Sequence, residues 1–390
     1  MKKSRRTLLL QLTLLITALT AAPMAASETF QWLSEVTFQS NDYEFEYKSS
    51  ALRQKDLWVV VGLRNRGQLS GPQQYQIWKV DSQGKRLAQI DLNTIAPVGR
   101  SQEKHVRVYD IAILKNGNVS VLTETGGNQT SFLVFDGVNA RLVTNRLIES
   151  PLSNTFISKI FAADDGDLVV LGRSGSHGLM LKLRSSGEIA ARAIIGNEKL
   201  TVLTDGFEMA DHTFALLGEH LDDTGQTSIW VGRVTFKGEV LYKNTFAGRD
   251  GTIAYDGDTR AYMVVYGAVG TNAGNVSLQT FTDNLSPVGH FSLLSGIKMS
   301  QRFRVVLAGN GSIFVVGVNA KNRLWMARIS EDGEIISSST YEEPSAQWQR
   351  LWNYDLLSTS TELLIPSTEL LVGSENELRQ VLKIFRKRRS

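Results

Sequence analysis

The sequence contains no cysteine among its 390 residues. Disulfide bonds and thiolate-bound metal sites are therefore excluded, together with the function classes that depend on them. A chain without these crosslinks must be stabilised by its apolar core alone. A mature protein of roughly 360 residues is long enough for this, because a chain of that size buries most of its apolar surface on folding.

A strong charge of one sign is also missing. Lys and Arg total 42 and Asp and Glu total 39, and four of the basic residues lie among the first six, in a segment that we expect to be removed. The mature chain should therefore be close to neutral. Basic residues 386–389 at the C-terminus are interpreted as a solvated tail, because no aromatic residue is interleaved with them beyond Phe385. No nucleic-acid partner is expected.

A hydrophobic run long enough for a membrane anchor is not found at the N-terminus. The basic residues 1–6 are followed by the apolar segment 7–22, which polar residues interrupt and which is shorter than the roughly 20 residues that a bilayer requires. The small residues 21–27 complete the layout of a secretory signal, so we expect residues 1–26 to be a cleaved signal peptide and the mature protein to be periplasmic, with no transmembrane anchor. Residues 4–9 also resemble a twin-arginine signal, and both export routes stay open.

Convincing catalytic and metal motifs are absent as well. No Gly-x-Ser-x-Gly element is expected between a strand and a helix, and residues 172–176 are interpreted as a flexible link. The acidic segment 164–167 lacks calcium-loop spacing and is interpreted as a hairpin turn. The five histidines show no zincin spacing, and the three that should lie on loops, His105, His177 and His220, fall in different repeats. We therefore predict no metal site and no cofactor.

What the sequence does contain is a repeat. Short apolar runs, most closed by a small residue, recur about every 45 to 50 residues over most of the chain, at 57–62, 119–123, 168–172, 214–218, 263–267, 313–317 and 363–366. A turn dipeptide such as Asn116-Gly117 or Asp165-Gly166 precedes most copies. Further strands are expected before each turn and after each run, with Gly-Glu or Gly-Lys closing a second hairpin. Each repeat is therefore predicted to be a four-stranded antiparallel meander.

Seven such repeats predict an all-β fold, a seven-bladed β-propeller of four-stranded antiparallel blades, as a single domain over residues 28–390. The last repeat has strands only at 348–356, around 363–365 and at 380–385, so it lacks one. The unassigned strand 30–38 can supply it. We therefore expect a 3+1 closure of the ring by the N-terminal strand, which also removes an open sheet edge.

The Gly-Glu turns make the mature chain similar to bacterial periplasmic propellers built from such repeats, including relatives of the quinoprotein type. The resemblance is one of fold. The tryptophan-docking signature of quinoprotein blades, the Trp-Asp pair of WD repeats and the Asp-box of sialidases are all missing. The resemblance therefore implies the architecture and carries no particular activity.

Candidate binding residues come from the loops expected at one end of the channel, where rigid propellers present variable segments. Alternation along the strands groups arginines with aromatic residues, a combination that suits an anionic or sugar-like ligand or a partner's carboxylates. The same arginines could instead form ion pairs between blades. The predicted ligand- or partner-binding residues are Arg64, His105, Arg107, Tyr109, His177, His220, Arg302, Arg304, Arg350 and Trp352.

Two functions follow from this reading. The favoured one is an exported, non-catalytic binding or assembly module that contacts a periplasmic or cell-envelope protein, or an anionic small molecule or saccharide, through these loops. The alternative is a periplasmic enzyme that uses the same face, either a quinone-cofactor dehydrogenase or a carbohydrate-active hydrolase or lyase. Catalytic residues cannot be assigned for it from the sequence.

Overall fold

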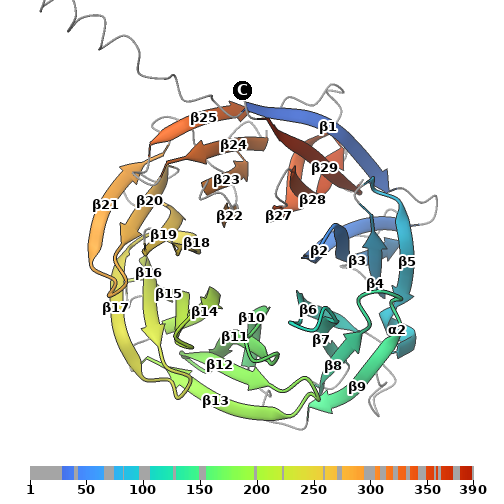
Figure 1. The fold of residues 1–390 in the computed structure, drawn as a ribbon, viewed down its shortest axis with the longest axis horizontal. Helices are drawn as coiled ribbons and strands as arrows, with labels where there is room; N and C mark the ends of the chain where they lie inside the picture. The colour runs from blue at the N-terminus through green and yellow to red at the C-terminus, as the bar shows by residue number, and fades with distance from the viewer. Residues whose placement is uncertain are drawn as a thin grey trace, which may run out of the picture.

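The computed structural model is a ring of β-sheets (Figure 1). In the six four-stranded sheets the first strand lies nearest the centre and the last forms the rim, whereas in the remaining sheet the N-terminal strand lies on the rim. The β-propeller fold predicted from the repeats is confirmed. The structure describes residues 29–38, 43–65, 74–81, 83–95, 106–125, 129–148, 155–196, 200–221, 224–257, 260–269, 275–293, 304–307, 313–318, 324–330, 334–340, 348–354, 357–358, 362–371 and 378–388.

Six sheets are four-stranded antiparallel meanders in sequence order, and we number them as blades 1 to 6. Blade 1 contains β2 (Tyr43–Arg53), β3 (Asp56–Asn65), β4 (Gln74–Val80) and β5 (Arg86–Asp91) and is followed by the short helix α2 (Leu92–Ile95). Blade 2 contains β6 (Arg107–Ile113), β7 (Val119–Thr125), β8 (Gln129–Phe135) and β9 (Leu142–Ile148). Blade 3 contains β10 (Thr155–Ala162), β11 (Leu168–Ser174), β12 (His177–Leu183) and β13 (Ile189–Ile195).

The other half of the ring repeats this plan. Blade 4 contains β14 (Leu200–Glu208), β15 (Phe214–Leu221), β16 (Thr227–Val234) and β17 (Val240–Ala247). Blade 5 contains β18 (Arg249–Asp256), β19 (Ala261–Gly267), β20 (Val276–Phe281) and β21 (Pro287–Ser292). Blade 6 contains β22 (Arg304–Leu307), β23 (Ile313–Val318), β24 (Leu324–Ile329) and β25 (Ile335–Thr340).

The expectation of seven equivalent four-stranded blades closed 3+1 is wrong, because the remaining sheet has five strands. The expected pairing of the N-terminal strand with the last strand of the chain is present in it. The sheet contains β1 (Thr29–Phe38), β29 (Leu378–Arg388), β28 (Glu362–Leu371) and β26 (Trp348–Tyr354) in that order, with β27 (Leu357–Ser358) also paired with β28. Two short strands thus lie against β28, which is long enough for both. No hydrogen-bonded ladder joins any described sheet to its neighbour, so the ring is not closed by hydrogen bonds between sheets.

The C-terminal basic residues also differ from expectation. The strand predicted to end at Phe385 continues through Arg388, and β29 pairs with β1 from Gln380↔Phe38 to Arg388↔Thr29. Residues 386–388 therefore belong to a strand, and of the predicted tail only Arg389 lies outside the described part of the chain. Within the described residues, no helix is long and apolar enough to span a lipid bilayer.

The core consists of apolar layers between neighbouring blades. Alternate residues of the buried second strands enter the layers on either side, as in β3, where Val59 packs with Trp78 of its own blade and Val60 packs with Val119 of blade 2. Both valines are essentially inaccessible to solvent. Burial on two faces explains why these strands read as continuous apolar runs in the sequence.

A β-bulge interrupts the inner strands of blades 1 to 4. The bulged residues are Lys48 in β2, Tyr109 in β6, Ser158 in β10 and Thr204 in β14. A bulge turns one side chain away from the regular alternation of the strand. It therefore decides which residues of the inner strands face the channel and which face the next blade.

Candidate functional site

The meander gives the ring two different faces. Turns between first and second strands and between third and fourth strands lie on one side, which we call the hairpin face. Connections between second and third strands and between successive blades lie on the other, which we call the loop face. The predicted binding residues that the structure describes lie toward the loop face. Arg107 and Arg304 lie where inner strands begin, and Arg64, His177 and His220 lie near the connections between second and third strands.

Arg107 and Tyr109 meet on the loop face of blade 2. Arg107 is the first residue of β6 and is exposed, and its guanidinium carbon lies 5.7 Å from the centre of the Tyr109 ring. The Tyr109 hydroxyl donates a hydrogen bond to Glu124 Oε2 on β7 at 2.8 Å. Glu124 is the cross-strand neighbour of Arg107, but among the described residues no carboxylate forms an ion pair with its guanidinium, which lies over the Tyr109 ring.

Blade 1 supplies charged and phenolic groups next to this pair. On β2, Lys48 Nζ lies 2.5 Å from Glu46 Oε1. The pKa of Tyr75 on β4 is raised to about 12, chiefly by burial and also by the Glu46 carboxylate, while the Arg107 guanidinium acts in the opposite direction. Glu46 belongs to blade 1 and Arg107 to blade 2, and both charges act on the Tyr75 hydroxyl. The site therefore spans two blades.

The Tyr109 hydroxyl is held in its protonated form. Burial raises the pKa of Tyr109 well above its ordinary value, and the hydrogen bond to Glu124 raises it further. A phenol in this state donates a hydrogen bond and does not serve as a base near neutral pH. Because that hydrogen bond goes to Glu124, Arg107 is the member of this pair whose N–H groups can bind an anion.

Blade 3 carries a second arginine–aromatic pair that sequence reasoning missed. Arg173 on β11 lies opposite Phe156 on β10, with its guanidinium carbon 5.8 Å from the ring centre. Both side chains are exposed, and no carboxylate among the described residues pairs with Arg173. The interpretation of residues 172–176 as a flexible link is wrong, because β11 runs to Ser174 and a two-residue turn leads directly to His177. Only the register shows that Phe156 and Arg173 are neighbours.

The other predicted site residues do not join this group. His177 begins β12 on blade 3, Arg304 begins β22 on blade 6 and is half-buried, and Arg64 is half-buried near the end of β3. His105 and Arg302 lie outside the described residues, as do the side chains of Arg350 and Trp352, whose backbone belongs to β26. Blades 2 and 6 lie on different sides of the ring (Figure 1). The structure therefore groups Arg107 with Tyr109 alone.

His220 lies in a different environment, a groove of about 540 Å³ between the rims of blades 3 and 4. Its other lining residues include Ile194, Trp230 and Tyr242. A groove of about 400 Å³ lies between the rims of blades 2 and 3, lined by Arg146 and Glu188 among others. Rim grooves occur at both boundaries with different linings, so we interpret them as a consequence of blade packing.

The acidic segment 164–167 forms the turn that its sequence predicts. Gly166 N–H donates to the carbonyl of Ala163 at 3.0 Å, and Ala163 N–H donates to the carbonyl of Asp167 at 2.8 Å. No group of three potential metal ligands in the described part of the chain includes His177 or His220. His212 does belong to such a group, on the opposite, hairpin face.

Comparison with known proteins identifies the fold alone. No protein family and no curated protein matches the sequence. Among solved structures, the chain is similar to a catalytically inactive virginiamycin B lyase from Staphylococcus aureus with quinupristin (TM-score 0.56, 11% identity, covering 91% of this chain and 99% of that one). It is also similar to the Dos1 propeller (0.57, 9%, 93% and 97%) and to the polysaccharide lyase Uly1 (0.57, 9%, 92% and 99%).

Proposed function

We propose that the protein is an exported, non-catalytic binding module that recognises an anionic group through arginine–aromatic pairs on its loop face. The observation that carries this proposal is the pair of Arg107 and Tyr109. A guanidinium stacked on a ring, with no carboxylate partner among the described residues, presents N–H groups in the geometry that a carboxylate or phosphate accepts. Arg173 over Phe156 repeats the arrangement on the next blade.

The surroundings support recognition over catalysis. The raised pKa of Tyr109 leaves its hydroxyl as a donor, and Glu124 accepts that hydrogen bond and so fixes the ring beneath Arg107. Fixing the ring lowers the conformational entropy lost on binding. The anionic group would belong to a periplasmic or cell-envelope protein, or to an anionic small molecule or saccharide. Cleavage of residues 1–26, and kinship with bacterial propellers of the Gly-Glu turn type, are parts of the same proposal.

The experiment uses tag-free mature protein with photo-crosslinking residues placed at Phe156 and, as a control, at Val288 on the rim of blade 5. Crosslinking in intact cells identifies the partner, and its binding is then measured with Arg107→Ala, Arg173→Ala and Arg184→Ala proteins. Arg184 is an exposed arginine paired with Glu188 away from the loop face. We expect the first two substitutions to weaken binding at least about tenfold and the third to leave it unchanged. Equal effects of all three would contradict the proposal.

The alternative is a periplasmic enzyme that uses the loop face. Two of the similar structures are lyases, but at 9% and 11% identity they show a shared fold and no shared activity. An absorption spectrum of the purified protein tests for a quinone chromophore, and incubation with uronate-containing polysaccharides tests for lyase activity by the unsaturated product. A chromophore or a turnover that Arg107→Ala abolishes would replace the binding proposal by the enzymatic one.

A further inference from the structure

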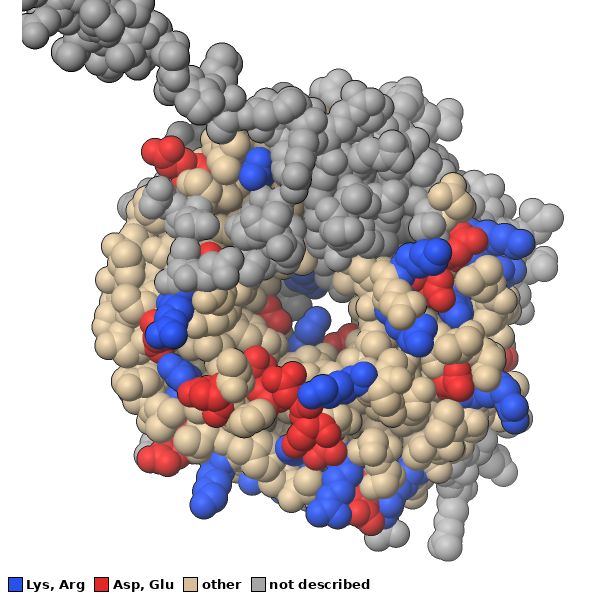
Figure 2. Space-filling model, viewed as in Figure 1, with Lys and Arg blue, Asp and Glu red and all other residues tan. Residues whose placement is uncertain are grey.

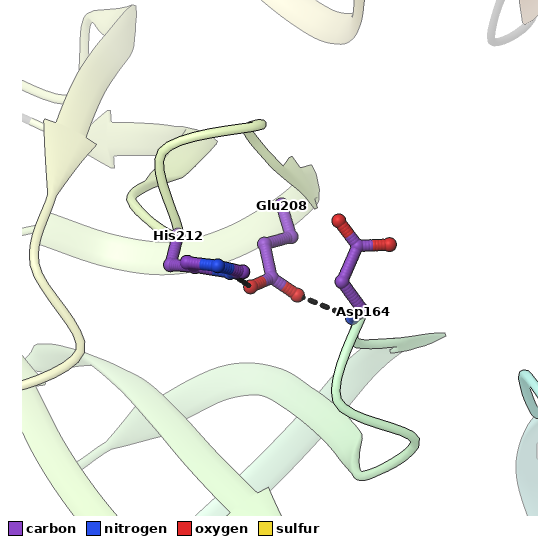
Figure 3. Close-up of side chains that lie close together, drawn as sticks. All are labelled: Asp164, Glu208 and His212. Atoms are coloured by element: carbon purple, nitrogen blue, oxygen red, sulfur yellow. Dashed lines mark hydrogen bonds and ion pairs between the residues drawn. The ribbon is translucent and has the colours of Figure 1, made fainter.

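Three side chains with metal-binding groups meet on the hairpin face, where blade 3 borders blade 4 (Figure 3). Asp164 lies in the turn after β10, Glu208 ends β14, and His212 lies in the turn after β14. One ligand atom of each lies within 4.8 Å of those of the other two. An imidazole nitrogen and two carboxylate oxygens therefore converge from two blades.

Hydrogen bonds fix Glu208 at the centre of the group. Its Oε2 accepts the backbone N–H of Asp164 at 2.6 Å, and its Oε1 lies 2.9 Å from His212 Nδ1. The Glu208 side chain is only 8% exposed, whereas that of His212 is 73% exposed. The Asp164 carboxylate stands beside that of Glu208 in Figure 3. The group is thus anchored by a buried carboxylate and open to solvent on the histidine side.

The carboxylates of Asp164 and Glu208 have no Lys or Arg partner among the described residues, unlike neighbouring aspartates. Asp165 and Asp167 pair with Lys182, and Asp211 pairs with Arg233. No Lys or Arg of the described residues pairs with the carboxylate of Asp164 or Glu208, and Lys115 Nζ donates to the backbone carbonyl of Asp164 instead. Figure 2 shows acidic side chains gathered beside the central opening over β10 and β14. Two adjacent carboxylates without a cationic side chain favour a bound cation.

His212 occupies a turn position that is glycine in blades 2 and 3. Gly117 and Gly166 donate their N–H groups to the carbonyls of Leu114 and Ala163, and His212 donates in the same way to that of Met209. All three residues have a positive φ, which is 81° and 92° in the glycines and 62° in His212. Blade 4 alone of these three thus presents a ligand-bearing side chain at this point of the turn.

We propose that Asp164, Glu208 and His212 bind a divalent first-row transition cation, with Zn²⁺ as its representative. One imidazole nitrogen with two carboxylate oxygens is a donor set that suits such ions better than Ca²⁺ or Mg²⁺, which prefer oxygen alone. On binding, the cation takes the place of the proton between His212 Nδ1 and Glu208 Oε1, which leaves to solvent, and water completes the coordination. The ion would join the turns of blades 3 and 4.

Isothermal titration of tag-free, chelator-treated mature protein with ZnCl₂ tests this site. We expect one Zn²⁺ per chain, with an affinity at least about tenfold lower in Asp164→Asn and in His212→Ala. Asp164→Asn is the cleaner variant, because it keeps the backbone N–H bond to Glu208. Asp165→Asn, in the same turn, and His290→Ala, on the rim of blade 5, are matched controls that should leave the affinity unchanged. CaCl₂ should bind much more weakly than ZnCl₂.

Thermal unfolding gives a second readout that does not depend on heats of binding. Zn²⁺ should raise the Tm of the wild-type protein and of the two controls, because a ligand that binds only the folded state stabilises it. The Tm of Asp164→Asn should rise less at the same Zn²⁺ concentration. No saturable Zn²⁺ binding, or binding that survives both Asp164→Asn and His212→Ala, would overturn the proposal. Neither result would bear on the loop face, which lies on the other side of the ring.

Discussion

At the scale of single residues, two aspartates, the buried Asp110 and the half-buried Asp205, carry hydrogen bonds from one blade to the next. Asp110 Oδ1 accepts the N–H of its own neighbour Ile111, and Oδ2 accepts the N–H of Ile160 in blade 3, both at 2.9 Å. Asp205 does the same toward Ile253 of blade 5 and also accepts the Thr252 hydroxyl. Each carboxylate thus supplies an acceptor to backbone N–H groups of two neighbouring blades.

Asp110→Ala should therefore lower the free energy of unfolding by about 2–3 kcal/mol, because it leaves two buried N–H groups without an acceptor. Asp81 provides the matched control. Its carboxylate also accepts two backbone N–H groups, from Gln83 and Lys85, but in an exposed turn where water can replace it. Asp81→Ala should cost less than about 1 kcal/mol. Urea unfolding followed by circular dichroism measures both, and equal losses would contradict this account.

Tyr75 should make the fold sensitive to alkali. Burial raises its pKa from 10.0 to about 12, so the folded state disfavours the phenolate. The stability that this provides is fully present below pH 10 and is lost as the pH rises from 10 to 12. Tyr75→Phe should raise the pH at which half of the protein is unfolded by alkali. Tyr242→Phe, at an exposed tyrosine, should leave that pH unchanged. Tyrosinate absorbance recorded with circular dichroism against pH checks the shift, and an unchanged midpoint in Tyr75→Phe would argue against it.

At the scale of elements, the second strands were predictable and the inner-strand geometry was not. The apolar runs at 57–62, 168–172 and 214–218 all fall within buried strands of the structure. The bulges that place Tyr109 and Ser158 leave no mark in the hydrophobic pattern, because they depend on pairing with a neighbouring strand. The pairing of Arg173 with Phe156 was missed for this reason, although both residues are plain in the sequence.

Close approach between strands makes Gly172 sensitive to substitution. A Cβ at this position would lie 1.9 Å from the carbonyl oxygen of Phe156, next to the bulge of β10. Gly172→Ala should therefore displace β10 and lower the free energy of unfolding by about 1–3 kcal/mol. Gly257→Ala is the control, since a Cβ there meets nothing within 4 Å. Denaturant unfolding compares the two, and a Gly172→Ala protein as stable as wild type would refute the predicted clash.

At the scale of the whole molecule, the ring rests on side-chain packing between sheets. Each apolar layer draws on two neighbouring blades, as in the layer that joins Trp58 of blade 1 to Leu133 of blade 2. The irregular five-stranded sheet was not foreseen, because its length and its two short partners depend on how β28 extends past Pro366 to Leu371. Repeat spacing predicts how many units there are. It does not predict how an individual unit departs from the average.

The proposed export concerns the whole chain and can be tested separately. If residues 1–26 are a signal peptide, protein isolated from the periplasm should begin near Ser27 or Glu28, which mass spectrometry of the intact chain will show. Replacing Arg5 and Arg6 together by Lys distinguishes the routes, because twin-arginine export requires the arginines whereas ordinary secretion needs only positive charge. Protein that retains its N-terminus in the cytoplasmic fraction would contradict export.

The sequence alone determined the repeat, the four-stranded meander and the β-propeller, because turn residues and apolar runs act over a few neighbouring residues. It also grouped Arg107 and Tyr109, two residues apart, on one side of a strand, and the structure brings these two side chains together. Only the tertiary structure decided how the last sheet is built, that Arg173 lies over Phe156, and that Asp164 meets Glu208, 44 residues away. Contacts between blades depend on register and on the packing angle between sheets, and neither is encoded in a local pattern.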